Sequence, residues 1–302
     1  MTSTIAVGPR QVKSTCPYCG VGCGIVLNVD ERDRITWVDD DPANLSSLGM
    51  LCVKGRFATG FVNHPDRLTH PLIKRNGEFQ QATWDEALDY IAERLLPHRD
   101  AFGSFASAKA TNEDAFIQQK FVRLVMGNNN IDHCTRLCHS PSVEAMLMQL
   151  GSGATSNSYA DYEDAACIMI VGCDPGSNHP VAASRMRRAI DDRGAKLIVV
   201  NPKRIDMCER ATIFLQNRAG TDVAVFTGMA RAVLDARVED TAFIGSRTEE
   251  FDAWRVATLE HTVEQYAEIA GVDAGQLREA GLLFARPPQL PGGLDPAGSC
   301  LV

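Results

Sequence analysis

Three cysteines lie within eight residues near the N-terminus, and a fourth follows further along the chain. The spacing is C-x2-C-x3-C-x28-C, made by Cys16, Cys19, Cys23 and Cys52. Thiolates are soft ligands that bind zinc or iron–sulfur clusters. Zinc sites usually come as two short cysteine pairs, whereas here one glycine-rich loop offers three ligands and a distant position the fourth. This asymmetry favours a 4Fe–4S cubane, with zinc and purely structural thiols as the open alternatives.

A second stretch, CTRLCHSPSV at positions 134–143, combines two cysteines with a histidine. A single cysteine is usually a small buried hydrophobe, so the residues around it must decide. Ser140 and Pro141 predict an N-cap and a first helical position. Cys138 would then lie just before a helix N-terminus, where the helix dipole favours the thiolate that binds metals. Cys138 is therefore a candidate metal ligand, and His139 follows it directly.

The C-terminal half alternates strands and helices. Unbroken apolar runs at 166–172 and 196–201 predict strands buried on both faces, and 211–216 predicts a weaker third strand. Helical patterns cover 181–192, between the first two strands, and 222–235, after the third. Such alternation is typical of a parallel sheet with right-handed crossovers.

Ligands of parallel sheets bind at the carboxyl ends of the strands. The candidate cofactor-binding residues in the loops there are Gly172, Asp174, Gly176, Asn178 and His179, then Asn201, Lys203 and Arg204, then Gly220, Thr221 and Asp222. Many of these are ordinary turn formers. Their place after successive strands favours cofactor binding, because helix N-termini and basic side chains suit pyrophosphate. No GxGxxG stands here, so the usual NAD-binding fingerprint is missing.

The N-terminal half mixes shorter elements. Strand-like pieces lie at 24–29 and 34–40, and the Asn76-Gly77 turn predicts a hairpin over 72–83. Thr83 and Glu86 predict a capping box for a helix over 84–96. A further helix is expected over 112–127, closed by its final glycine.

The predicted fold class is α/β, with a small Cys-rich 4Fe–4S domain followed by α/β domains, the last of them with a Rossmann-like parallel sheet. The predicted boundaries are 1–60 for the cluster domain, 61–137 for the first part of a discontinuous α/β domain, 138–285 for the Rossmann-like domain and 286–302 for an irregular tail rich in Pro and Gly.

Bulk composition narrows the classes of partner. The 302 residues carry a net charge of −8 and no basic block, which argues against nucleic acid or an anionic membrane surface. No apolar run approaches the ~20 residues of a membrane span, and a signal-peptide core and a twin-arginine pair are missing. A cytoplasmic location is therefore expected, in which the ten cysteines are mostly reduced.

The motifs TCPYCGVGCGI and GMLCVKGR resemble the N-terminal 4Fe–4S domain of molybdopterin oxidoreductases that use a bis(guanine dinucleotide) cofactor. HCTRLCHSPSVEAM and VGCDPGSNHPVAASRMRRA are similar to the catalytic alpha subunit of metal-dependent formate dehydrogenases. The resemblance runs to about Ala285. It implies two-electron oxidation of formate to CO2 at a molybdenum or tungsten centre, with electrons leaving through the cluster to iron–sulfur or diaphorase partner subunits.

The resemblance also implies roles for individual residues. Cys138 corresponds to the metal ligand, His139 to the active-site histidine, and Lys54 to a lysine between the cluster and a pterin, although most lysines are ordinary surface groups. Cys134 matches no catalytic role and is interpreted as structural. Assimilatory nitrate reductases share the N-terminal motif but usually lack the histidine, so the Cys-His pair favours formate.

A rival interpretation is a non-catalytic electron-transfer or cofactor-binding module. The family's catalytic subunits continue well beyond the length of this chain and carry an active-site arginine there. The tail RPPQLPGGLDPAGSCLV does not resemble their next strand. These 302 residues alone are therefore expected to have no formate dehydrogenase activity.

Overall fold

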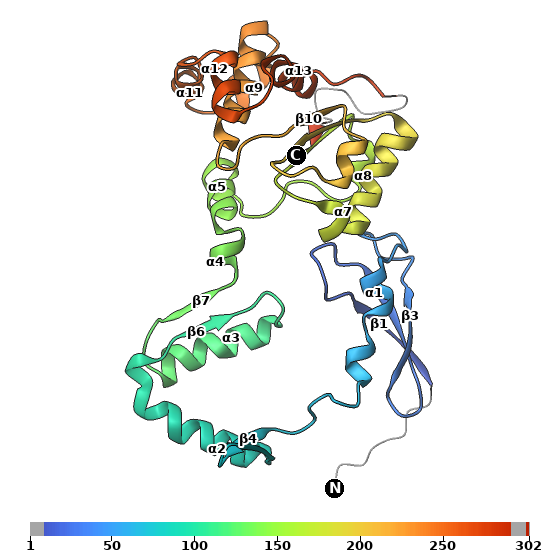
Figure 1. Cartoon of the computed structure of the whole chain (residues 1–302), viewed down its shortest axis with the longest axis vertical. Helices are drawn as coiled ribbons and strands as arrows, with labels where there is room; N and C mark the ends of the chain where they lie inside the picture. Colours follow the sequence, from blue (N-terminus) through green and yellow to red (C-terminus); the bar gives the residue numbers. More distant parts are fainter. Residues whose placement is uncertain (1–8, 291–299, 302) are drawn as a thin grey trace. The chain divides into compact units, whose positions relative to one another are not determined.

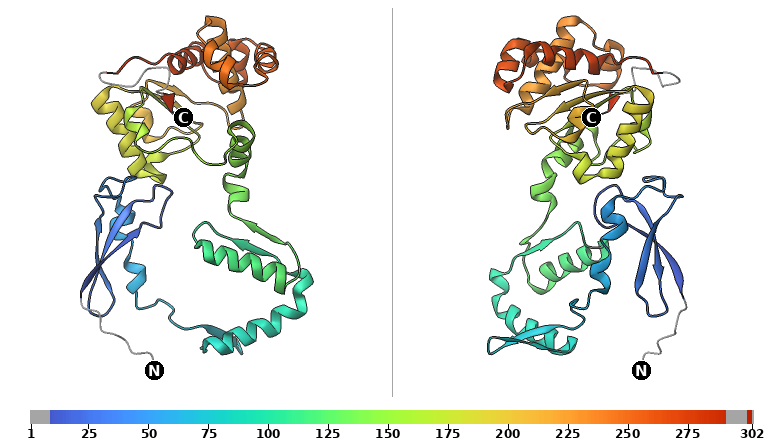
Figure 2. Two further views of the ribbon diagram at one scale, coloured as in Figure 1. Left: turned by 180° about the vertical axis from the view of Figure 1, so that it is seen from behind. Right: turned by 45° about the vertical axis from the view of Figure 1, so that its right-hand side comes forward.

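The computed structural model describes residues 9–290 together with residues 300 and 301. They divide into two compact units, one of residues 9–31, 36–57, 157–290 and 300–301, the other of residues 32–35 and 58–156. The first unit thus joins the N-terminal cysteine region to the C-terminal α/β region. Figure 1 and Figure 2 show the elements of each unit.

The cysteine region is a three-stranded sheet in the order β1-β2-β3. Its elements are β1 (Arg10–Thr15), β2 (Gly24–Val29), β3 (Ile35–Asp40) and the short helix α1 (Val53–Phe57). β1 and β2 are antiparallel, with Thr15 opposite Gly24 as the last pair. The eight residues between this pair form the loop that carries the first three cysteines.

The α/β region is built on a parallel sheet in the order β10-β9-β8-β11. The strands are β8 (Cys167–Val171), β9 (Lys196–Val200), β10 (Ile213–Leu215) and β11 (Cys300–Leu301). The first three confirm the strands predicted from the apolar runs. In β8 and β9 alternate side chains enter two separate cores, which is why both strands are apolar throughout.

Helices cover both faces of this sheet (Figure 1). The elements of the first group are α6 (Asp161–Asp164), α7 (Pro175–Asn178), α8 (Pro180–Arg193) and η4 (Asp206–Glu209). The elements of the second are α9 (Asp222–Ala236), α10 (Thr241–Arg247), α11 (Phe251–Thr258), α12 (Val263–Ala270) and α13 (Ala274–Ala285). Side chains of α8 and η4 pack on one face and those of α9, α12 and α13 on the other.

The tail differs in part from its predicted irregular form. Residues 291–299 and 302 lie outside the described residues, so the prediction over 286–302 is untested there. Cys300 and Leu301, however, form β11 and pair in parallel with Cys167 and Ile168 of β8. Backbone hydrogen bonding along the edge of β8 therefore includes two residues that carry no local strand signal.

The second unit contains a hairpin and a strand–helix–strand segment. Its elements are η1 (Gly60–Asn63), β4 (Leu72–Arg75), β5 (Glu78–Gln81), α2 (Trp84–Leu95), η2 (Leu96–Ala101), β6 (Ser104–Ala106), α3 (Asn112–Lys120), the π-turn η3 (Phe121–Val125), β7 (Ile131–His133), α4 (Thr135–Cys138) and α5 (Ser140–Leu150). The hairpin and the Thr83–Glu86 capping box are confirmed, and Asn76 and Gly77 have the positive φ of a two-residue turn.

Candidate functional site

The loop between β1 and β2 gathers three of the cluster cysteines. The N–H of Cys16 donates to the carbonyl oxygen of Cys23 at 2.9 Å, which closes the loop at its base. Cys16 and Cys23 are buried, and Cys19 and Cys52 are half-buried. Gly22 has a φ of 67°, so the tight return of the chain to Cys23 uses a left-handed conformation that glycine adopts without strain.

The pKa of the Cys23 thiol responds to the other three cysteines of the motif. Burial, and next the negative charges of Cys16, Cys19 and Cys52, raise the pKa of Cys23 to about 11. A thiol in this setting needs a cationic partner to become a thiolate, and iron supplies that charge. Four cysteine thiols, of which three raise the pKa of the fourth, are soft donors of the kind that binds an iron–sulfur cluster. Among the described residues, no three His, Cys, Asp or Glu side chains form a ready-made site for a metal ion.

Lys54 extends from α1 towards the loop after β8. Its Nζ lies 3.4 Å from the carbonyl oxygen of Ser177 in α7 and donates to it. Gly55 follows, where a Cβ would come within 3.4 Å of the Cys16 sulfur. The helix α1 therefore touches both the cysteine loop and the first of the predicted cofactor-binding loops.

The loop after β8 contains five of the predicted residues. Gly172 has a φ of 57°, and Asp174 caps α7 by accepting from the N–H and hydroxyl of Ser177. A Cβ at Gly176 would lie 2.6 Å from the carboxylate oxygens of Asp206, so this glycine allows a close approach. The last two, Asn178 and His179, are exposed where α7 meets α8.

The imidazole of His179 lies against the cysteine loop. A Cβ on Gly20 would come within 3.8 Å of its Nε2 atom. A residue of the predicted dinucleotide loop is thus also a neighbour of the predicted cluster.

The loop after β9 is tied to the loop after β8. Asn201 is buried, its Nδ2 donates to the carbonyl oxygen of Cys173 at 3.1 Å, and its Oδ1 accepts from the N–H of Lys203 at 2.9 Å. Lys203 and Arg204 are exposed, and the guanidinium of Arg204 lies 5.8 Å from the centre of the Phe214 ring. Asn201 therefore fixes the loops, while the two cations remain open to an anionic group.

The loop after β10 holds a residue that sequence reasoning missed. Asn217 is 3% exposed, and its Nδ2 donates to the carboxylate of Asp222 at 3.2 Å. Its buried Oδ1 has no hydrogen-bond partner within the described chain. Gly220 has a φ of 82°, and Thr221 is the N-cap of α9. A buried acceptor beside a helix N-terminus fits a bound group that brings its own N–H or O–H donor. The signal in the sequence was an asparagine two residues after the end of β10.

In the second unit, Cys138 and His139 follow the carboxyl end of β7. β6 and β7 pair in parallel with α3 between them, so this end of the strand is an expected ligand position. Both side chains are exposed. The N–H of Ala108 donates to the Cys134 sulfur at 3.3 Å, which gives Cys134 a structural contact.

The predicted cap of the following helix is wrong by one residue. The helix α5 begins at Ser140, and its N-cap is His139, whose side chain makes no capping hydrogen bond. Cys138 instead ends the single turn α4, where its N–H donates to the carbonyl oxygen of Cys134. Because α4 presents its C-terminal end at Cys138, the helix dipole of α5 is a weaker argument for a thiolate than the sequence indicates.

Comparison with known proteins now decides the family. Residues 67–270 match the molybdopterin oxidoreductase family, and residues 9–64 match the molybdopterin oxidoreductase Fe4S4 domain. The chain belongs to the molybdopterin oxidoreductase family. The predicted α/β fold with an N-terminal Fe4S4 domain is confirmed, and so is the predicted pair of cofactors, a 4Fe–4S cluster and a molybdopterin. The assignment of individual residues stays a prediction.

Curated members of the family include alpha subunits of formate dehydrogenases. The chain is 41% identical over 275 residues to the F420-dependent formate dehydrogenase subunit alpha of Methanocaldococcus jannaschii, covering 91% of this chain and 41% of that protein. It is 37% identical to the F420-dependent formate dehydrogenase 1 subunit alpha of Methanococcus maripaludis, covering 90% and 40%. This molybdopterin oxidoreductase chain therefore spans about two fifths of the length of these relatives.

Among solved structures, the acetylene hydratase of Pelobacter acetylenicus has a similar fold. The TM-score is 0.74 at 24% sequence identity, covering 90% of this chain and 38% of that one. At this identity the match establishes the fold alone. Along the described part of the molybdopterin oxidoreductase chain, no helix has both the length and the apolar character to cross a membrane.

Proposed function

We propose that this chain is the N-terminal part of the catalytic subunit of a formate dehydrogenase. The supporting observation is the Cys138-His139 pair in the segment that follows β7, in a chain whose relatives at 41% and 37% identity are formate dehydrogenase alpha subunits. Formate would release CO2, one proton and two electrons. When bound, the molybdenum or tungsten centre of a bis(guanine dinucleotide) cofactor supplies the two-electron redox chemistry.

The residues of the chain have distinct tasks in this proposal. The Cys138 sulfur would ligate the metal, which needs the thiolate form. The imidazole of His139, the residue next in the chain, takes up the proton that formate releases, the usual role of histidine in such sites. Exposure of both side chains leaves them accessible to a cofactor and a substrate.

The three loops at the carboxyl ends of β8, β9 and β10 would hold a guanine dinucleotide. Lys203 and Arg204 offer positive charge for its phosphates, and the unpartnered Oδ1 of Asn217 offers an acceptor for an N–H donor of the bound group. Electrons would leave through a cluster held by Cys16, Cys19, Cys23 and Cys52. Lys54 would lie on that route, since α1 touches the loop after β8.

Partner subunits with iron–sulfur or diaphorase centres would accept the electrons, and the F420-dependence in the names of both methanogen relatives makes F420 one acceptor to assay. A cytoplasmic location belongs to the same proposal. The alternative of an assimilatory nitrate reductase-like enzyme predicts nitrate reduction in place of formate oxidation. The alternative of a non-catalytic module predicts neither.

The test uses the chain fused to the C-terminal remainder of the M. jannaschii relative, expressed with cofactor supply. We expect formate-dependent viologen reduction that is lost in Cys138→Ala and retained in Cys134→Ala, with unchanged iron and sulfide in both. X-ray absorption should lose one sulfur neighbour of the metal in Cys138→Ala only. Full turnover by Cys138→Ala would refute the ligand assignment. Nitrate reduction without formate oxidation would support the second candidate.

A further inference from the structure

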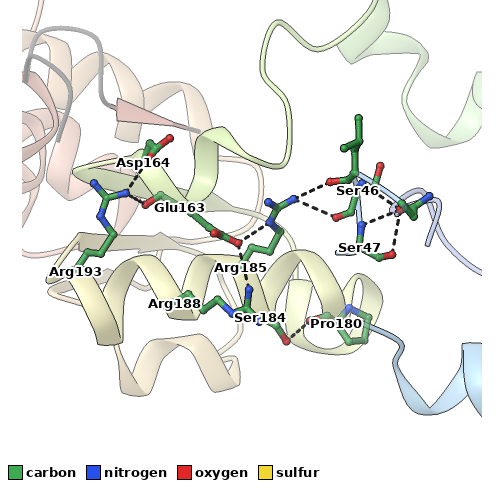
Figure 3. Close-up of polar contacts among 11 residues, drawn as sticks. Ser46, Ser47, Glu163, Asp164, Pro180, Ser184, Arg185, Arg188 and Arg193 are labelled. Atoms are coloured by element: carbon green, nitrogen blue, oxygen red, sulfur yellow. Dashed lines mark hydrogen bonds and ion pairs between the residues drawn. The ribbon is translucent and has the colours of Figure 1, made fainter. Parts of the chain in front are cut away.

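Arg185 of α8 is the only charged residue that is buried within the described chain, with 3% of its surface exposed. Its Nε donates to the Glu163 carboxylate at 2.7 Å (Figure 3). Its Nη1 donates to the backbone carbonyl oxygens of Leu45 and Ser46 at 3.3 and 3.2 Å. Removing an arginine from water is costly unless good partners replace the lost hydration. Both sets of partners lead from Arg185 towards the cysteine loop.

The first connection runs through the turn that contains Ser46. The Oδ1 of Asn44 organises this turn by accepting from the N–H groups of Ser46 and Ser47 at 3.1 and 2.9 Å. The Nδ2 of the same asparagine donates to the carbonyl oxygen of Gly22, between Cys19 and Cys23, at 3.3 Å. A Cβ on Gly24 would lie 2.6 Å from the Asn44 Cβ, so the turn sits directly against the loop.

The second connection runs through Glu163 and the segment around α6. Tyr159 precedes α6 and packs edge-on against Tyr162, with ring centres 5.8 Å apart. Its hydroxyl donates to the carbonyl oxygen of Gly20 at 3.1 Å. The ion pair between Arg185 and Glu163 therefore fixes the position of α6, and with it the tyrosine that hydrogen-bonds Gly20.

We propose that Arg185 is a positioning residue for the iron–sulfur loop, acting through Asn44 on Gly22 and through Tyr159 on Gly20. In a trans peptide the N–H points opposite to the carbonyl of the preceding residue. Fixing the carbonyls of Gly20 and Gly22 on these donors therefore turns the N–H groups of Val21 and Cys23 away from them. Hydrogen bonds and burial around cluster sulfurs set the reduction potential. Arg185 thus controls the cluster without touching it.

This inference rests on the proposed cluster ligands Cys16, Cys19, Cys23 and Cys52. It does not depend on formate as the substrate. The test is anaerobic reconstitution of the 302-residue chain, followed by iron and sulfide analysis, electron paramagnetic resonance of the reduced cluster and a redox titration. These readouts report on the cluster itself and need no enzymatic activity.

We expect Arg185→Met to lower the midpoint potential of the cluster and to add a second set of g values. The reduced cluster carries one more electron, and it is disfavoured both by the loss of a positive charge and by the loss of the hydrogen bonds that fix the Gly20 and Gly22 carbonyls. The midpoint potential should also shift in Arg185→Lys, because an ammonium group keeps the charge but cannot reproduce the several N–H donors of the guanidinium. Asn44→Ala and Tyr159→Phe should each give a smaller shift in the same direction.

Arg188→Met is the matched control. Arg188 lies on the same helix and pairs with the same Glu163 oxygen at 3.6 Å, but its side chain is 48% exposed. We expect the midpoint potential of this variant to equal that of the wild type. A shift as large as that of Arg185→Met would show a general effect of charge and would overturn the proposal.

Two further outcomes would also overturn it. One is an Arg185→Met protein with full iron, full sulfide and wild-type spectra. The other, decisive if Arg185→Met does not fold, is an unchanged midpoint in Tyr159→Phe, which loses only one hydroxyl. A wild-type chain that binds zinc without sulfide would overturn the ligand assignment and this inference together, whereas the other outcomes leave that assignment intact.

Discussion

The Nζ of Lys54 lies 3.4 Å from the backbone carbonyl oxygen of Ser177, 123 positions later in the chain. Lys54 follows Cys52 by two residues, and Ser177 belongs to the loop after β8. A lysine two residues after a predicted cluster ligand therefore places its positive charge on a predicted dinucleotide loop. The contact joins the two halves of one compact unit, so it is a feature of that unit's fold.

Replacing this charge should change the cluster electronically. We expect Lys54→Met to keep full iron and sulfide but to lower the midpoint potential, because a nearby cation stabilises the reduced state. Lys196→Met is the control, since Lys196 begins β9 at the amino end of the sheet, opposite the loops. Redox titration of the reconstituted chain measures the shift. Equal midpoints for Lys54→Met and the wild type would exclude an electronic role for this lysine.

The ligand assignment predicts a sharp difference between cysteines. Cys23→Ser should lose most of the bound iron and acid-labile sulfide, because a hydroxyl is a poor ligand for iron–sulfur clusters. Cys173→Ser, at an exposed cysteine after β8, should retain both. Anaerobic reconstitution followed by metal and sulfide analysis checks this. Stoichiometric zinc without sulfide in the wild type would replace the cluster by the zinc alternative.

The packing of α13 on α9 makes a stability prediction. A Cβ on Gly281 would lie 2.5 Å from the Met229 carbonyl oxygen and 3.0 Å from its Cα, and backbone cannot move aside as a side chain can. We expect Gly281→Ala to lower the free energy of unfolding by about 1–3 kcal/mol, the usual cost of overpacking.

The matched control is Gly245→Ala in α10, where a new Cβ meets nothing within 4 Å. This change should be neutral or stabilising by up to about 1 kcal/mol, because alanine is the better helix former. Urea unfolding followed by circular dichroism compares the two variants. Destabilisation of the same size in both would contradict the close helix contact.

An ion pair between α12 and α13 predicts a response to acid. The guanidinium of Arg278 hydrogen-bonds Glu264 at 2.5 Å and lowers the pKa of this carboxyl. A lowered pKa stabilises the folded state above the ordinary glutamate pKa, and the stabilisation is lost as the pH falls through the folded value.

Below about pH 4.5, the ordinary pKa of glutamate, the free energy of unfolding should therefore decrease more steeply with falling pH in the wild type than in Glu264→Gln. Both groups of the pair are well exposed, so the difference should be small and should shrink with added salt. Urea midpoints between pH 3 and pH 7 measure it. Parallel pH curves for both proteins would mean that the pair contributes nothing.

Local patterns in the sequence predicted local structure well. The Asn76-Gly77 turn and the Thr83–Glu86 box depend on residues a few positions apart, so spacing alone specifies them. The strands β8 and β9 were also clear, because burial on both faces demands an unbroken apolar run. The cap of α5 was misplaced by one residue because Ser140 and Pro141 fit either register.

Contacts that depend on distant segments were not predictable. Nothing local marks Arg185 among the three arginines of SRMRRA, and only its contacts with Leu45 and Glu163 set it apart. The buried Oδ1 of Asn217 and the edge strand β11 likewise depend on tertiary placement. For the candidate site, the cysteine spacing indicated the chemistry, while the supports of the loop required the structure.

The hydrogen bond from Tyr159 to Gly20 has a consequence for biosynthesis. Gly20 leaves the ribosome 139 residues before its partner, and Arg185 is made later still. Contacts between segments so far apart form late, since the chain entropy of closing the intervening loop must be overcome first. We therefore expect the nascent cysteine loop to lack the hydrogen bond from Tyr159 and the support of Arg185 while the α/β region is translated. Cluster insertion would then be timed by the folding of a domain made later, not by the appearance of the cysteines themselves.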